Sequence, residues 1–234
     1  MRPLAVALLL VAALAAGCGA SGGPSAESTA ETATTQTATD ATSTVVAYVV
    51  RNGKVAAERR VVPATKAVGR AALDELGLPV ASLTIADGTA HVELAREPTE
   101  LERAQIVFTL TEFPTVQRVE IGGRTLTRTD VDLLAPPIVV VEPQPGDTVS
   151  SPVRVRGSAD ALEATFQIEV LDRTGTVVAH RTVTATSGSG ERGSYDVSIP
   201  YEGAERGPGR IVAYEDSAAD GSRIHVVETP VVLR

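Results

Sequence analysis

The stretch TELERAQIVFTLTEFPTV, residues 99–116 of the 234-residue chain, predicts a helix with a defined start. Thr99 and Glu102 have the spacing of a capping box, in which each side chain binds a backbone amide exposed at the first turn. One face of this helix would carry Leu101, Ala104, Val107, Phe108 and Thr111. We expect that face to pack against a β-sheet.

The surrounding residues, 45–134, are expected to form a small α+β region with two helices on a mostly antiparallel sheet. Asn52-Gly53 and Asp87-Gly88 are two-residue hairpin signals, and each lies between alternating apolar and polar positions. A first helix is predicted over residues 63–76, ended by Gly77 and Pro79. Further strands are predicted over 45–50, 55–62, 83–85, 90–94, 116–121 and 124–128.

Ala135-Pro136-Pro137 interrupts regular structure and marks a boundary. Beyond it, short strands are predicted over residues 138–141, 153–157, 165–171, 177–185, 194–199, 210–214 and 224–233. Strands at this spacing, without a helical period, are typical of an immunoglobulin-like β-sandwich, which we expect over residues 138–234. We expect the two regions to fold as separate units, with Phe108 and Phe166 in their cores.

Residues 1–17 have the pattern of a bacterial lipoprotein signal peptide. Arg2 precedes an apolar run over 4–16, and small residues lead up to Cys18. The run is too short to span a bilayer, which takes about 20 helical residues. We therefore predict cleavage before Cys18, lipidation of its thiol and a position on the extracytoplasmic face of the cell membrane. The alternative is an ordinary secretory signal followed by a free cysteine.

Residues 18–44 begin with the predicted lipidation site, and the stretch after Cys18 consists mainly of Ser, Thr, Ala, Gly and Glu. Such a composition buries too little apolar surface to offset the entropy of ordering, so we expect a disordered tether. The chain has 29 acidic and 21 basic residues, a net charge of −8. This balance argues against nucleic acid as a partner and against electrostatic binding to anionic lipid. The lipid on Cys18 would then be the means by which the protein attaches to the membrane.

Candidate catalytic and metal-binding side chains are scattered. His91, His180 and His225 are isolated in the sequence, and no Gly-x-Ser-x-Gly motif occurs. The densest carboxylate group lies at 215–220, where calcium binding is the alternative to simple turn chemistry for Glu215, Asp216 and Asp220. We favour turn chemistry. We therefore expect no catalytic residue, no metal and no cofactor, and a protein that is not an enzyme.

Two segments resemble known families. Residues 104–116, with Val119 and Gly122-Gly123, resemble the GerMN domain of sporulation and spore germination proteins. A second resemblance is to the Gmad2 domain, an immunoglobulin-like module found with spore germination proteins. It is carried by residues 143–152, Val155, Gly157, Ala159, residues 163–166 and residues 214–222. The resemblance implies a role in sporulation, germination or another envelope assembly.

From these features we predict a lipid-anchored extracytoplasmic scaffold or protein-interaction module with an envelope protein as its partner. The alternative is a lipoprotein that binds a cell-wall glycan or another carbohydrate.

Overall fold

The computed structural model describes residues 41–234. The predicted signal peptide, Cys18 and residues 18–40 of the predicted tether lie outside the described residues. Among the residues described, no helix is both long and apolar enough to cross a membrane.

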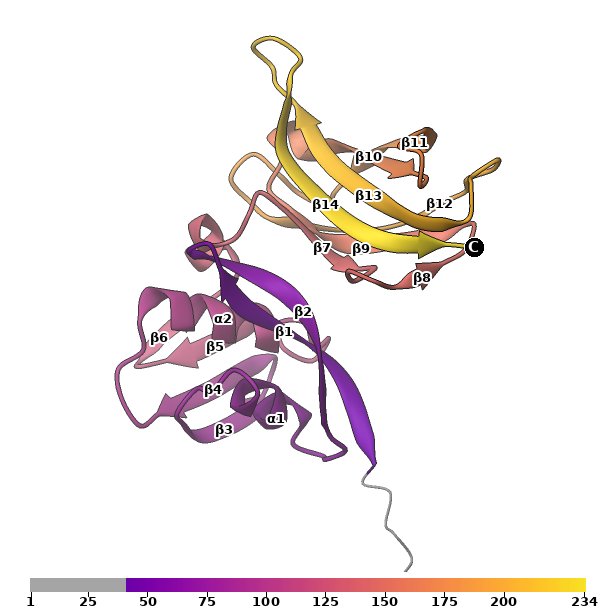
Figure 1. The fold of residues 1–234 in the computed structure, drawn as a ribbon. Helices are drawn as coiled ribbons and strands as arrows, with labels where there is room; N and C mark the ends of the chain where they lie inside the picture. Colours follow the sequence, from indigo (N-terminus) through magenta and orange to yellow (C-terminus); the bar gives the residue numbers. More distant parts are fainter. Residues whose placement is uncertain (1–40) are drawn as a thin grey trace, which may run out of the picture. The chain divides into compact units, whose positions relative to one another are not determined.

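The first region contains a hairpin, a four-stranded sheet and two α-helices (Figure 1). Strands β1 (Thr42–Arg51) and β2 (Lys54–Pro63) form the hairpin, and α1 spans Val68–Asp74. The sheet has the order β3 (Val80–Ala86), β4 (Thr89–Leu94), β5 (Arg118–Ile121) and β6 (Arg124–Leu126). Helix α2 (Glu100–Leu110) connects β4 to β5, and a 3-10 helix, η1 (Thr129–Leu134), follows β6. Since a helical crossover lies between them, β4 and β5 pair in parallel.

Several boundaries differ from those predicted. Strand β1 begins at Thr42, inside the predicted tether, because Thr42 and Ser43 pair with Pro63 and Val62 of β2. Helix α1 is shorter than the predicted 63–76 because Pro63 is the last residue of β2 rather than the first of a helix. The hairpins at Asn52-Gly53 and Asp87-Gly88 are confirmed, and all four turn residues have positive φ.

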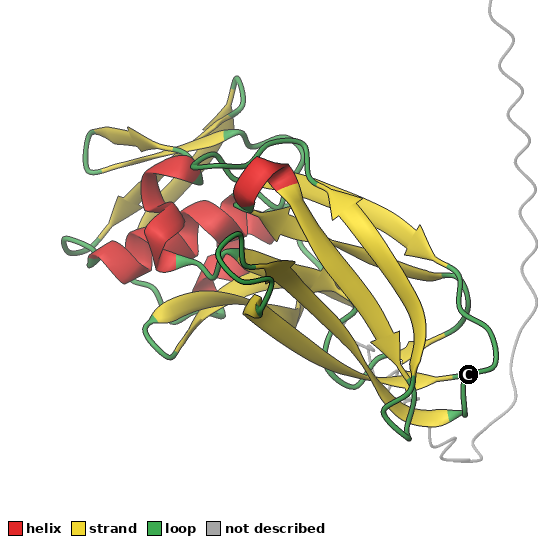
Figure 2. Cartoon of the chain, turned by 90° about the horizontal axis from the view of Figure 1, so that it is seen from above, coloured by secondary structure: helices red, strands yellow, loops and turns green. Residues whose placement is uncertain are grey.

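The predicted capping box of α2 is confirmed. The Glu102 amide donates to Thr99 Oγ1 at 3.2 Å, and the Thr99 amide donates to Glu102 Oε2 at 2.8 Å. The prediction of a single buried face is too narrow, because every residue from Arg103 to Leu110 is buried. The helix contacts the strands β1, β2 and β5 and the helices α1 and η1. Figure 2 shows the helices, in red, grouped among the strands, in yellow. A helix buried all round is expected to be apolar all round, and its polar side chains need partners.

Two of those polar side chains complete the open edge of β1. In a two-residue hairpin the residues next to the turn bond to each other, so the backbone groups of alternate residues point away from the partner strand. Tyr48 is such a residue: its amide donates to Thr109 Oγ1 at 2.9 Å, and its carbonyl accepts from Gln105 Nε2 at 3.0 Å. Side chains of α2 thus take the place of a neighbouring strand.

The second region is an immunoglobulin-like sandwich of two sheets, with the orders β11-β10-β13-β14-β8 and β12-β9-β7. The strands are β7 (Ile138–Glu142), β8 (Thr148–Val149), β9 (Val153–Ala159), β10 (Thr165–Leu171), β11 (Val177–Thr184), β12 (Gly193–Ile199), β13 (Gly207–Asp216) and β14 (Arg223–Leu233). All seven predicted strands are present, and the two-residue β8 is the addition. Phe108 and Phe166 are buried as predicted, and Phe166 packs edge-on against Tyr195 with ring centroids 4.9 Å apart.

The bond between Tyr48 and α2 yields a stability prediction. Thr109→Val keeps the side-chain shape but removes the acceptor of the Tyr48 amide, which is then buried without a partner. We expect the free energy of unfolding to fall by about 1–3 kcal/mol in urea denaturation. The control is Thr125→Val on the exposed side of β6, for which a change within about 0.5 kcal/mol is expected. Equal effects of both variants would contradict the assigned role of Thr109.

Candidate functional site

A cleft of about 490 Å³ lies between the two regions. Its walls are formed by the end of α2, the start of η1, strands β7 and β9, and the segment that leads into β12. The charged and hydroxyl side chains that line it are Thr111, Glu112, Thr127, Arg128, Thr129, Arg156, Ser158, Thr186, Arg192 and Ser194. Because residues of both regions line the cleft, we take it as the candidate functional site of the folded part.

Glu112 is the acidic centre of the cleft. Its carboxylate accepts hydrogen bonds from Tyr48 Oη at 2.9 Å, Arg128 Nη2 at 2.7 Å and Arg156 Nη1 at 3.3 Å. Burial opposes ionisation of Glu112, but the neighbouring arginines and the hydrogen bonds outweigh it and hold the pKa below its ordinary value. Arg156 belongs to β9, so one carboxylate ties the two regions together.

Arg192 makes the second link. Its side chain is 1% exposed, and its Nε contacts the Asp132 carboxylate in η1. Nη2 donates to the Pro136 carbonyl at 2.7 Å, and Nη1 donates to the Pro137 carbonyl at 3.3 Å. The guanidinium also lies 5.7 Å from the centre of the Phe108 ring, within range of a cation–π contact. A side chain of the second region therefore fixes the boundary segment and reaches α2.

Strand β7 continues the core of the first region past the boundary. Its side chains alternate: Val139 and Val141 belong to the same buried cluster as Phe108, whereas Ile138 belongs to the core of the sandwich. Both faces of this strand are thus covered by protein. We expected separately folding regions, but a strand shared by two cores favours one cooperative unit.

A further contact joins the β1–β2 hairpin to the second region. The Arg59 guanidinium donates two hydrogen bonds to the Asp147 carboxylate, at 2.7 and 2.9 Å. Asp147 also accepts from the Gln144 amide at 2.9 Å, which orders the loop between β7 and β8. At a protein surface, such a bidentate ion pair fixes the relative orientation of the two side chains more than it adds to the free energy of unfolding.

The predicted candidate residues lie away from this cleft. His91 is exposed on β4 and its Nδ1 lies 2.9 Å from Glu120 Oε2; His180 is exposed on β11. His225 Nδ1 lies 2.7 Å from Glu215 Oε1. Within residues 41–234, no group of three or more His, Cys, Asp or Glu side chains is arranged to hold a metal ion.

The carboxylates at 215–220 do not act together. Asp220 Oδ1 accepts from the amide and hydroxyl of Ser222 at 3.1 and 2.7 Å, which is turn chemistry as predicted. Glu215 is instead buried and accepts from the Leu162 amide at 3.0 Å. Cys18, the predicted lipidation site, lies outside the described residues.

Sequence reasoning missed Glu112, Arg128, Arg156 and Arg192. Glu112 lies just beyond the end of α2, where a glutamate is ordinarily exposed, so nothing in its local setting indicates burial. Arg192 follows the Ser-Gly segment 187–190, and nothing in that setting indicates burial. Its partners are 55 to 60 residues away, so only folding brings them together.

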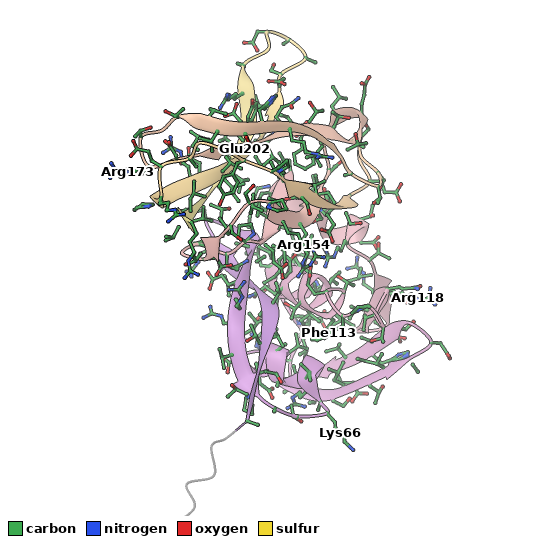
Figure 3. All side chains as sticks on the ribbon, turned by 90° about the vertical axis from the view of Figure 1, so that its right-hand side faces the viewer. Lys66, Phe113, Arg118, Arg154, Arg173 and Glu202 are labelled. Atoms are coloured by element: carbon green, nitrogen blue, oxygen red, sulfur yellow. The ribbon has the colours of Figure 1, made fainter. Side chains whose placement is uncertain are left out.

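Stability should depend on pH through Glu112. Because its pKa is lowered in the folded state, its contribution is complete above the ordinary value of 4.5 and is lost as the pH falls through the lower folded value. Glu112→Gln should therefore be less stable than the wild type at neutral pH, and the difference should shrink on acidification. Urea denaturation over a pH series measures this. Glu202→Gln, a change at an exposed residue labelled in Figure 3, is the control. A difference in the free energy of unfolding between Glu112→Gln and the wild type that does not change with pH would contradict the assignment.

Coupling between the regions should depend on Arg192. Removing one partner of a buried ion pair leaves the other without compensation, so Arg192→Ala should lower the free energy of unfolding by about 3–5 kcal/mol. The matched control is Arg154→Ala, which breaks an exposed pair with Asp196 on the same sheet and should cost at most about 1 kcal/mol. Calorimetry should show one transition for the wild type. Two independent transitions, with only one shifted by Arg192→Ala, would contradict the coupling.

Comparison with known proteins assigns part of the chain. Residues 137–222 match the family described as Gmad2, the immunoglobulin-like domain of bacterial spore germination. No protein of curated function matches the chain. Among solved structures, the crystal structure of CopC from Methylosinus trichosporium OB3b is similar, with 18% sequence identity, 41% of this chain and 92% of that chain covered, and a TM-score of 0.27. The predicted Gmad2 domain is thus confirmed over residues 137–222, and the GerMN resemblance of the first region stays a prediction.

Proposed function

We propose that the protein is a lipid-anchored protein-interaction module on the extracytoplasmic side of the cell envelope. The Gmad2 domain supports an association with germination or a related envelope assembly. The lipoprotein pattern that ends at Cys18 supports the anchor, and the net charge of −8 leaves the lipid as the means of membrane attachment.

The observation that carries this proposal is the internal pairing of charges in the cleft. Glu112 is bonded to Tyr48, Arg128 and Arg156, and Arg192 is bonded to Asp132 and two backbone carbonyls. These groups hold two regions in a fixed relation. Two regions in a fixed relation present their binding surfaces in one geometry. Such a protein loses little conformational entropy when a partner binds.

A second candidate function has one observation in its favour. Hydroxyl side chains of Thr111, Thr127, Thr129, Thr186 and Ser194 line the cleft and offer donors and acceptors to a polar ligand such as a cell-wall glycan. Among the described residues that line the cleft, none is aromatic, so a ring on which a sugar could stack is not provided there. This makes glycan binding the weaker proposal.

The test begins with the anchor. Cys18→Ser should move the full chain from the membrane fraction to the soluble extracytoplasmic fraction, because the two chains of a diacylglycerol bury apolar surface worth about 0.8 kcal/mol per methylene. Ser21→Ala, a nearby change that keeps Cys18, should stay with the membrane. Retention of the serine variant in the membrane would contradict lipid anchoring.

The same cells test the partner. Crosslinking of intact cells, followed by detergent extraction and capture of the full chain, should recover envelope proteins in defined adducts. Purified cell wall, offered to the same extract, should not compete for the chain. Recovery without any adduct, together with saturable binding to purified cell-wall glycan, would overturn the interaction proposal and support the second candidate.

A further inference from the structure

Strand β3 is an edge strand without the charges that other edges carry. It lies at one margin of the four-stranded sheet (Figure 1), and its sequence, VASLTIA, contains no charged residue. The other edge strands longer than two residues each contain at least one Lys, Arg, His, Asp or Glu. Charged residues on an edge prevent pairing with another chain, so β3 stands out as an edge open to pairing.

The backbone groups of this edge can be assigned from the hairpin. Asp87 and Gly88 form the two-residue turn, and Ala86 pairs with Thr89. In a two-residue hairpin, alternate residues direct their backbone groups away from the partner strand, as Tyr48 does in β1. In β3 these residues are Leu83 and Ile85, so their N–H and C=O groups point away from β4. Among residues 41–234, these four groups have no partner outside their own hairpin. The Ile85 side chain is 45% exposed beside them.

We propose that β3 pairs in antiparallel fashion with β3 of a second copy of this chain. The two-fold axis would pass beside Thr84, so that Leu83 lies opposite Ile85 of the second copy and both exchange backbone hydrogen bonds. The two four-stranded sheets then continue into one another. This inference rests on the proposed function, because it names a second copy as a partner of the interaction module.

Charge complementarity favours a second copy over an unrelated strand. Arg70 lies at one end of β3, where its Nη1 donates to the Ala81 carbonyl at 3.5 Å. Asp87 is exposed at the other end. In the proposed register the Ala81 end of β3, where the pairing with β4 is irregular, lies near Asp87 of the second copy. Each Arg70 already pairs with Asp74, with Nε 2.9 Å from Asp74 Oδ1, and would gain this aspartate as a further acidic partner. The symmetry produces this pairing twice.

Apolar and polar positions also match in this register. Leu83 of one copy lies beside Ile85 of the other on the helix-covered face, because Leu83 packs against the core that contains α2. Thr84 lies beside its own counterpart on the open face, a cross-strand pair that favours antiparallel sheets. A single strand edge buries little area, so we expect weak, concentration-dependent association.

Cysteine crosslinking tests the register. In the full chain carrying Cys18→Ser, the introduced Cys of Thr84→Cys is the one thiol. Opposite residues of this kind have Cα atoms about 4.5 Å apart, within the range of a disulfide. Ser82→Cys is the matched control, because two such residues would be about 13 Å apart along the strands. Under mild oxidation Thr84→Cys should give a covalent dimer, and Ser82→Cys should remain monomeric.

Sedimentation tests the association without a crosslink. Ile85→Lys places a charge at the centre of the contact and should weaken the dimer at least tenfold. Val226→Lys is the control, since Val226 is 47% exposed on β14, in a sheet that does not contain β3. It should leave the dimer constant unchanged. Circular dichroism spectra of both variants should match the wild type, which checks that both are folded.

Several outcomes would overturn the proposal. These are a monomeric mass for the wild type up to millimolar concentration, a disulfide in Ser82→Cys rather than Thr84→Cys, or capture of a different envelope protein by the cysteine of Thr84→Cys. The last outcome would assign the β3 edge to another chain. Envelope adducts of the wild type would persist in each case, so failure of the pairing is distinct from failure of the proposed function.

Discussion

Burial of α2 on all sides is the constraint on which the rest of the folded part depends. From Arg103 to Leu110 the helix has no solvent-exposed side, so its polar side chains there need partners within the protein. Thr109 and Gln105 do so by bonding to the Tyr48 backbone, which fixes the hairpin. Phe108, on the same helix, packs against the Tyr48 ring at a centroid distance of 5.0 Å and lies 5.1 Å from the Arg128 guanidinium. The helix therefore sets the positions of the hairpin, η1 and the cleft.

The contacts between the two regions specify geometry more than they add stability. Buried ion pairs often cost as much in lost hydration as they return in attraction. What Arg192 contributes is direction, because its planar guanidinium meets Asp132 and the carbonyls of Pro136 and Pro137 at once. The alternating side chains of β7 add apolar contact on both sides of the boundary. Together these features make a frame of fixed shape.

The sheet edges divide into protected and open ones. Charged residues mark most edges, and α2 side chains cover the outward groups of β1 at Tyr48. At Leu83 and Ile85 of β3 neither protection is present, although the same hairpin geometry exposes their backbone groups. A protein with such an open edge either tolerates its pairing with a strand of another chain or uses that pairing for assembly. Charged residues lie near its two ends: Arg70 of α1 contacts the Ala81 carbonyl, and Asp87 is exposed in the turn after the strand.

The sequence by itself determined the features that depend on residues close in the chain. The Asn-Gly and Asp-Gly turns, the Thr99–Glu102 capping box and the seven sandwich strands follow from local conformational preference and alternation. Only the tertiary structure decided where α1 begins, that β4 and β5 run parallel, and that Glu112 and Arg192 are buried. Arg192 and Asp132 are 60 residues apart, and their contact exists only once both regions have packed. Local sequence carries no record of a distant partner, so side chains that appear to be ordinary surface charges can become the interior of the fold.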